Sequence, residues 1–168
     1  MNIIHIEKPW ECYAFEDFLP PERWETIRAL GQKHLKRFYE VGVTTQNYEK
    51  KELAIRNKYS YYEDEDIIPE TNELFYKYDL PNRGYEGKLK KIIHWAISPS
   101  KWTYPAHCDN RARISTTILY VDPKKSDGTI LHKNLSKNDE GDHEEANQTS
   151  EYTYEIEWKP NKAFFHNS

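Results

Sequence analysis

A histidine and an aspartate lie two positions apart in the segment Tyr104-Pro105-Ala106-His107-Cys108-Asp109. In an extended chain, residues two apart project to the same side. The His107 imidazole and the Asp109 carboxylate can therefore converge on one point, while Cys108 faces away as an apolar filler. Two histidines and one carboxylate on one face of an octahedron form the facial triad that binds iron(II) and leaves three positions open. The pair predicts two of the three ligands of such a site.

The His-x-Asp pair is a weak signal by itself, because it occurs often by chance. Asp109-Asn110 also favours a turn, so the alternative is a surface turn in which His107 has a structural role. The elements that surround the pair must decide between these two interpretations.

The second half of the chain is predicted to be mainly β, with strands separated by turns rich in Pro, Gly, Asn and Asp. The expected strands are Leu89 to Ile97, Arg113 to Val121, Thr129 to His132 and Tyr152 to Trp158. Aromatic and polar residues alternate in the last of them, which is typical of a half-buried strand. The almost wholly polar stretch 133–150 is expected to be a solvated excursion between two strands.

The first half is predicted to support this β core. Glu11 to Phe18 indicates a strand, and the Pro-Pro pair after it starts a helix at Pro21, whose apolar stripe is Trp24, Ile27, Leu30 and Phe38. Residues 43–66 are polar and tyrosine-rich and are interpreted as strands and loops. A short helix is expected from Pro69, with Leu74, Phe75 and Tyr78 on one face, ending near Pro81.

The order of these elements resembles the prolyl-hydroxylase-like branch of the iron(II)- and 2-oxoglutarate-dependent dioxygenases. The resemblance covers nearly the whole chain except residues 43–88. It rests on the H-x-D motif, the strand that ends in Tyr120, the strand that begins after Gly128, and Pro160-Asn161-Lys162-Ala163-Phe164-Phe165. The opening Phe15 to Pro21, followed by a helix, is also similar. The resemblance implies an α+β fold, mainly β with flanking helices, in one domain (1–168). Residues 88–168 would form a double-stranded β-helix (jelly-roll, cupin-like) core, supported by residues 1–87.

The resemblance also implies a site and an activity. His107 and Asp109 would bind iron(II), Tyr120 would hydrogen-bond the tail carboxylate of 2-oxoglutarate, and Tyr104 falls where a pocket tyrosine is often found. The expected reaction converts 2-oxoglutarate and O2 to succinate and CO2 and hydroxylates a small-molecule or peptidyl substrate, with prolyl residues favoured by analogy and ascorbate as an accessory reductant. Tyr120 is also a natural core residue, whose hydroxyl would simply find a partner.

The chain departs from the family pattern at its C-terminal end. The family's third ligand is a histidine several residues after the strand that ends in Phe, and a basic 2-oxoglutarate anchor follows it. Truncation before these residues is the favoured interpretation; the alternative is that His166 replaces the distal histidine. Lys162 and Arg113 are cations that could pair with a dicarboxylate, although neither matches the anchor position. A rival function is a non-catalytic, cupin-like ligand- or metal-binding domain that has lost its last core strand, whose exposed edge would allow a homodimer.

Composition narrows the classes of partner. The net charge is −4 and the pI of the sequence is about 6.0, so neither nucleic acid nor an anionic membrane is an expected partner. The absence of a signal peptide and the presence of only two cysteines predict a cytoplasmic protein. His132 and His143 are expected to be solvent-exposed. No role is assigned to His5, His34 and His94, because none has a partner at ligand spacing.

Overall fold

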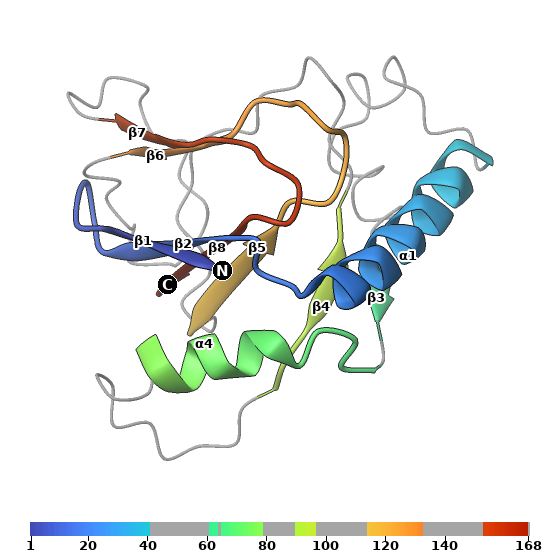
Figure 1. Ribbon diagram of the computed structural model, residues 1–168, viewed down its shortest axis with the longest axis horizontal. Coiled ribbons are helices and arrows are strands. Elements are labelled where there is room, and N and C mark those ends of the chain that lie inside the picture. The colour runs from blue at the N-terminus through green and yellow to red at the C-terminus, as the bar shows by residue number, and fades with distance from the viewer. Residues whose placement is uncertain (41–60, 64, 79–89, 97–113, 133–152, 168) are drawn as a thin grey trace, which may run out of the picture.

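The computed structural model describes residues 1–40, 61–63, 65–78, 90–96, 114–132 and 153–167. This part of the chain is mainly β, with two helices and antiparallel sheets (Figure 1), which is compatible with the predicted α+β class. Its elements are β1 (Asn2–Ile6), β2 (Cys12–Glu16), α1 (Pro21–Glu40), β3 (Tyr61–Glu63), α4 (Glu70–Tyr78), β4 (Ile93–Trp95), β5 (Ser115–Leu119), β6 (Thr129–His132), β7 (Thr153–Ile156) and β8 (Ala163–Asn167).

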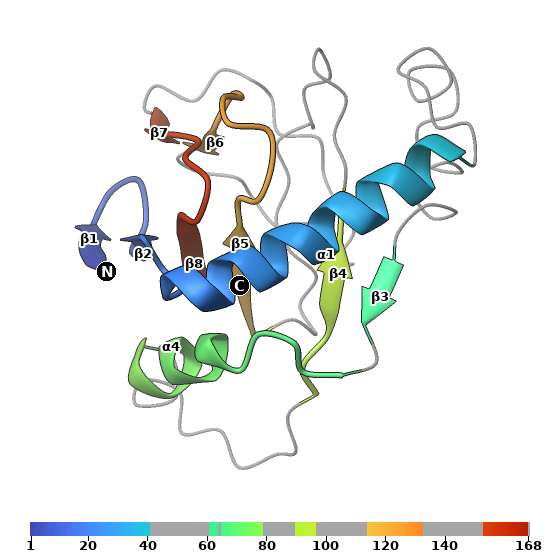
Figure 2. The same ribbon diagram turned by 45° about the vertical axis from the view of Figure 1, so that its right-hand side comes forward.

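The largest sheet has four strands in the order β1-β2-β8-β5, and each neighbouring pair is antiparallel. His166 of β8 is in register with Cys12 of β2 on one side and with Thr116 of β5 on the other. Two smaller sheets consist of β6 with β7 and of β3 with β4. In both views, β6 and β7 lie on one side of the large sheet and α4 lies on the other (Figures 1 and 2).

The four strands from β5 to β8 form two nested antiparallel pairs. The inner pair, β6 with β7, belongs to one sheet, and the outer pair, β5 with β8, belongs to another. Gly128 precedes β6 because the chain runs against β7 there: a Cβ at this position would lie 2.0 Å from the Ile156 carbonyl oxygen. The strands β5 to β8 therefore form a two-stranded antiparallel ribbon, whose outer pair lies in the large sheet and whose inner pair forms the β6–β7 sheet.

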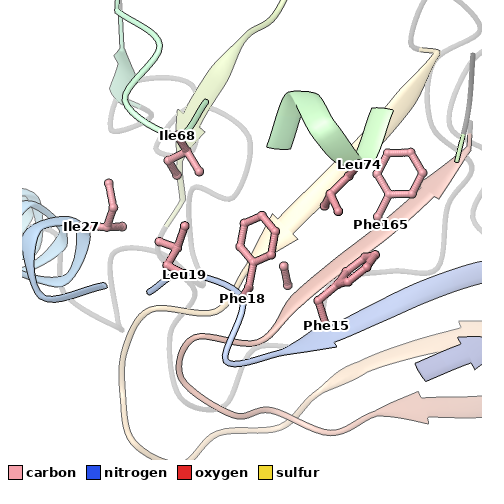
Figure 3. Packing of buried hydrophobic residues seen from close by; sticks show 8 residues of the cluster. Phe15, Phe18, Leu19, Ile27, Ile68, Leu74 and Phe165 are labelled. Carbon is pink, nitrogen blue, oxygen red and sulfur yellow. The ribbon is translucent and has the colours of Figure 1, made fainter. Parts of the chain in front are cut away.

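An apolar core fills the space between the large sheet and the two helices. Phe15 and Phe165 project from β2 and β8, Leu74 projects from α4, and Ile27 projects from α1 into the same cluster (Figure 3). Trp24 N–H donates to Pro20 O at 2.8 Å, the first helical hydrogen bond of α1, so the helix begins at Pro21 as the proline spacing predicts.

A second core lies between the large sheet and the β6–β7 pair. Strand alternation sends Cys12 and Ala14 of β2 and Phe164 of β8 to the face opposite Phe15 and Phe165. There they meet Leu131 of β6 and Ile156 of β7. The central strands β2 and β8 thus carry buried residues on both faces, which explains why Ala163, Phe164 and Phe165 form a continuous apolar run.

A type II turn at residues 159–162 connects β7 to β8. Lys162 N–H donates to Lys159 O at 3.0 Å, Pro160 is the second residue of the turn, and Asn161 has a φ of 63°. The Asn161 side chain then accepts a hydrogen bond from Leu19 N and donates one to Leu19 O, both at 2.9 Å. This turn fixes the entrance of α1 to the end of the β7–β8 connection.

The described elements confirm the predicted helices at Pro21 and near Pro69, and the four predicted strands of the second half. The first of these four is shorter than predicted, because it covers only Ile93–Trp95 of the described residues 90–96. Strand β1 was not predicted. The predicted excursion 133–150 lies outside the described residues.

Candidate functional site

The predicted metal ligands His107 and Asp109, and the predicted pocket residue Tyr104, lie outside the described residues, as do Cys108, Arg113 and His143. The described chain resumes at Ile114 and enters β5 at Ser115, which pairs with Asn167 at the end of β8. The H-x-D segment therefore leads into the end of the sheet at which β8 terminates.

Tyr120 is a core residue at the opposite end of β5. Its side chain is 3% exposed, and its hydroxyl donates a hydrogen bond to Thr129 Oγ1 at 2.5 Å. The ring stacks on Trp158 with a centroid separation of 4.5 Å. Burial raises the pKa of the phenol, although the hydrogen bonds with Thr129 oppose that effect. The hydroxyl thus has a partner within the protein, and its contact with 2-oxoglutarate stays a prediction.

His166 lies on the same face of the large sheet as Phe164, and its ring contacts two aromatic rings. Its imidazole stacks on Phe164 at 5.1 Å and meets the edge of Trp10 at 5.3 Å. Its Nδ1 lies 3.0 Å from Asn167 O. Within the described ranges, no group of three or more His, Cys, Asp and Glu side chains could hold a metal ion. A role for His166 as a third ligand therefore depends on His107 and Asp109 and stays a prediction.

Lys162 is buried and paired inside the fold. Its Nζ lies 3.4 Å from Glu16 Oε1, and Lys159 Nζ lies 3.6 Å from Glu16 Oε2. Burial alone would raise the pKa of the Glu16 carboxyl, but the two ammonium groups and a hydrogen bond with Asn2 together outweigh burial, and the pKa is lowered. A buried lysine without its carboxylate would be costly, so Lys162 is committed to Glu16 rather than poised for a dicarboxylate ligand.

A buried polar cluster that the sequence does not indicate connects α1 to β3 and β4. His34 Nε2 lies 3.0 Å from Glu63 Oε1, and the two side chains are 8% and 13% exposed. Trp95 Nε1–H donates to the same oxygen at 2.7 Å, and its ring lies 5.1 Å from the imidazole. The 29 positions that separate His34 from Glu63 explain why spacing gave no signal. The cluster satisfies its own polar groups and anchors α1.

The remaining histidines differ in their surroundings. His5 Nε2 lies 3.1 Å from Glu11 Oε1 on the surface, and its ring stacks on Tyr13. His132 is half-buried rather than exposed as predicted, because it ends β6 beside Trp10, whose indole N–H donates to the His132 carbonyl at 3.2 Å.

No protein-family profile, curated protein or solved structure matches this chain. None of the helices within the described ranges combines the length and the apolar character that crossing a membrane requires.

Proposed function

We propose that the protein is a non-haem iron(II)- and 2-oxoglutarate-dependent oxygenase that hydroxylates a small-molecule or peptidyl substrate. The observation that carries this proposal is the nested pairing of β5 with β8 and of β6 with β7. A jelly roll, or double-stranded β-helix, is built from such ribbons, each of which contributes paired strands to two facing sheets. The four described strands are consistent with half of that architecture.

The position of the H-x-D segment supports the same proposal. Asp109 precedes Thr116 by only seven positions, and Thr116 is in register with His166. A chain of that length spans at most about 25 Å when fully extended, which allows Asp109 to come close to the end of the ribbon that holds His166. His107 and Asp109 would supply two iron ligands, and the third would be His166 or a residue outside the described ranges. The bound iron and 2-oxoglutarate would supply the oxidising chemistry.

A second function, a non-catalytic cupin-like domain that binds a metal or ligand, is favoured by one observation. Two groups that could contact 2-oxoglutarate already have partners in the fold, since Tyr120 donates to Thr129 and Lys162 pairs with Glu16. A domain that kept its metal but lost its co-substrate would retain His107 and Asp109 without turnover.

The decisive experiment measures succinate released from 2-oxoglutarate in the presence of iron(II), ascorbate and oxygen. The protein is compared with His107→Ala and Asp109→Ala, and His143→Ala serves as a histidine control from the polar stretch. Loss of turnover in the first two variants alone supports the oxygenase. Equal turnover in all four proteins contradicts the metal assignment.

Binding of Mn(II), followed by electron paramagnetic resonance, separates the two functions because it needs no turnover. Mn(II) binding that requires His107 and Asp109, without any succinate release, supports the non-catalytic domain. The absence of both Mn(II) binding and succinate release would refute the oxygenase and the metal-binding form of the second function.

The role of Tyr120 is tested separately with Tyr120→Phe and the matched variant Thr129→Val. If the hydroxyl serves only the core, each variant loses about 1 kcal/mol of unfolding free energy, and the 2-oxoglutarate requirement stays unchanged. If the hydroxyl binds the co-substrate, Tyr120→Phe alone raises the 2-oxoglutarate concentration needed for half-maximal turnover.

A further inference from the structure

A hollow of about 240 Å³ lies where three elements meet: the first half of α1, the loop after β5 and the turn before β8. Helix α1 and these two connections lie close together in Figure 2. The lining residues are Trp24, Arg28, Val121, Asp122, Lys124 and Pro160. None of them belongs to the predicted iron site. We propose that this hollow binds a small aromatic carboxylate, and this proposal does not rest on the oxygenase function.

The charges of the hollow favour a single negative charge. Arg28 and Lys124 are its two cations, and Asp122 is the one carboxylate among its lining residues. Gln32 Nε2 donates to Asp122 Oδ2, so this carboxylate is already engaged. The Arg28 guanidinium lies 3.8 Å from Glu25 Oε2, which is too long for a hydrogen bond. A guanidinium with remaining donors recognises a carboxylate in a bidentate manner.

The other walls are apolar and favour a flat ring. Trp24 is aromatic, and Val121 and Pro160 are aliphatic. The volume is below the range of roughly 300–1,000 Å³ that is typical of drug-sized ligands. One ring with one carboxylate therefore suits the hollow better than a nucleotide or a peptide would. A polyanion would also meet Asp122.

The walls are held in place before any ligand binds. Trp158 Nε1–H donates to Pro123 O at 2.7 Å, and Asn161 N–H donates to Tyr120 O at 2.9 Å. On the helix side, a Cβ at Gly31 would lie 3.0 Å from Val121 Cγ1, so helix and loop are in close contact. A preorganised site avoids part of the entropic cost of binding.

The test uses benzoate as the probe, benzamide as its neutral isostere and inorganic phosphate as a simple anion. Binding is followed by NMR through the indole N–H signal of Trp24, which is assigned with Trp24→Phe. We expect saturable benzoate binding with a Kd of about 1 mM or below, which corresponds to about −4 kcal/mol. Benzamide and phosphate should each bind at least about tenfold more weakly.

The variants Arg28→Gln and Lys124→Gln should each weaken benzoate binding by about tenfold or more. Lys125→Gln removes an exposed neighbouring cation that does not line the hollow, and it should bind as the unmodified protein does. All three substitutions lie at positions that water reaches, and circular dichroism verifies their folds. The proposal is overturned by equal affinity for benzamide, by equal affinity for phosphate, by an equal loss in Lys125→Gln, or by the absence of saturation.

Discussion

Replacing Asn161 with alanine should destabilise the protein far more than a turn residue usually does. Asn161 is 7% exposed, and its side chain makes two hydrogen bonds of 2.9 Å to the backbone of Leu19, which is 1% exposed. The substitution leaves a buried N–H and a buried C=O of Leu19 unpaired, at about 1–3 kcal/mol each. The φ of 63° adds about 1 kcal/mol, because alanine tolerates the left-handed region less well than asparagine. We expect a loss of about 4 kcal/mol.

Urea unfolding followed by far-UV circular dichroism measures this loss, and Asn161→Gly separates its two components. Glycine accepts the positive φ without strain but still removes both side-chain bonds. It should therefore recover only about 1 kcal/mol relative to alanine. An alanine variant within about 0.5 kcal/mol of the unmodified protein, with an unchanged m value, would refute the proposed role of the side chain. Full recovery in the glycine variant would show that backbone strain is the whole effect.

Three further outcomes follow from the same structure. Gly128→Ala should separate β6 from β7 and lower the melting temperature sharply, because its Cβ would collide with the Ile156 carbonyl oxygen; a normal melting temperature contradicts this. The lowered pKa of Glu16 contributes stability above its unfolded pKa of about 4.3, and this contribution is lost as the pH falls through the folded pKa. Glu16→Gln should accordingly flatten the decline of unfolding free energy as the pH falls below about 4.3, and an unchanged slope argues against the Lys162 pair. Burial raises the pKa of the Cys12 thiol to about 12, so iodoacetamide should label it only after urea unfolds the protein. Mass spectrometry of the labelled peptide at pH 8 checks this, and rapid labelling of the native protein would contradict it.

The elements that could be predicted are those with strong local signals. Pro20-Pro21 and the helical apolar stripe located α1, and alternation located β7, because both patterns are set by the geometry of one element. Strand β1 gave no such signal. It is an edge strand of five residues that reads Asn-Ile-Ile-His-Ile, and only its pairing with β2 shows which face is buried.

The candidate site could be predicted only as far as its local motif. The H-x-D spacing is a property of one extended segment, so His107 and Asp109 are visible in the sequence. The partners of Tyr120 and Lys162 are not visible in the sequence. For Lys162 the reason is distance, since Glu16 lies 146 positions before it and only the fold brings the two together. The Asn161 side chain is hidden in the same way, since its partner Leu19 lies 142 positions away.

Two side chains of the types that could bind 2-oxoglutarate already form interactions that stabilise the fold. Tyr120 and Lys162 have the residue types expected of a 2-oxoglutarate contact, yet both lie at the turn corner around Asn161, where Thr129 and Glu16 satisfy them. His166 differs from them, because it lies at the opposite end of β8, in register with the strand that follows the H-x-D segment. If this chain binds iron, we therefore expect the metal to lie near the His166 end of the ribbon and not near the corner. Substituting His166 with glutamine should then weaken Mn(II) binding, whereas Lys162→Met should reduce stability and leave Mn(II) affinity unchanged. Weaker Mn(II) binding in Lys162→Met, with unchanged binding in the His166 variant, would instead indicate a metal site near the turn at Asn161.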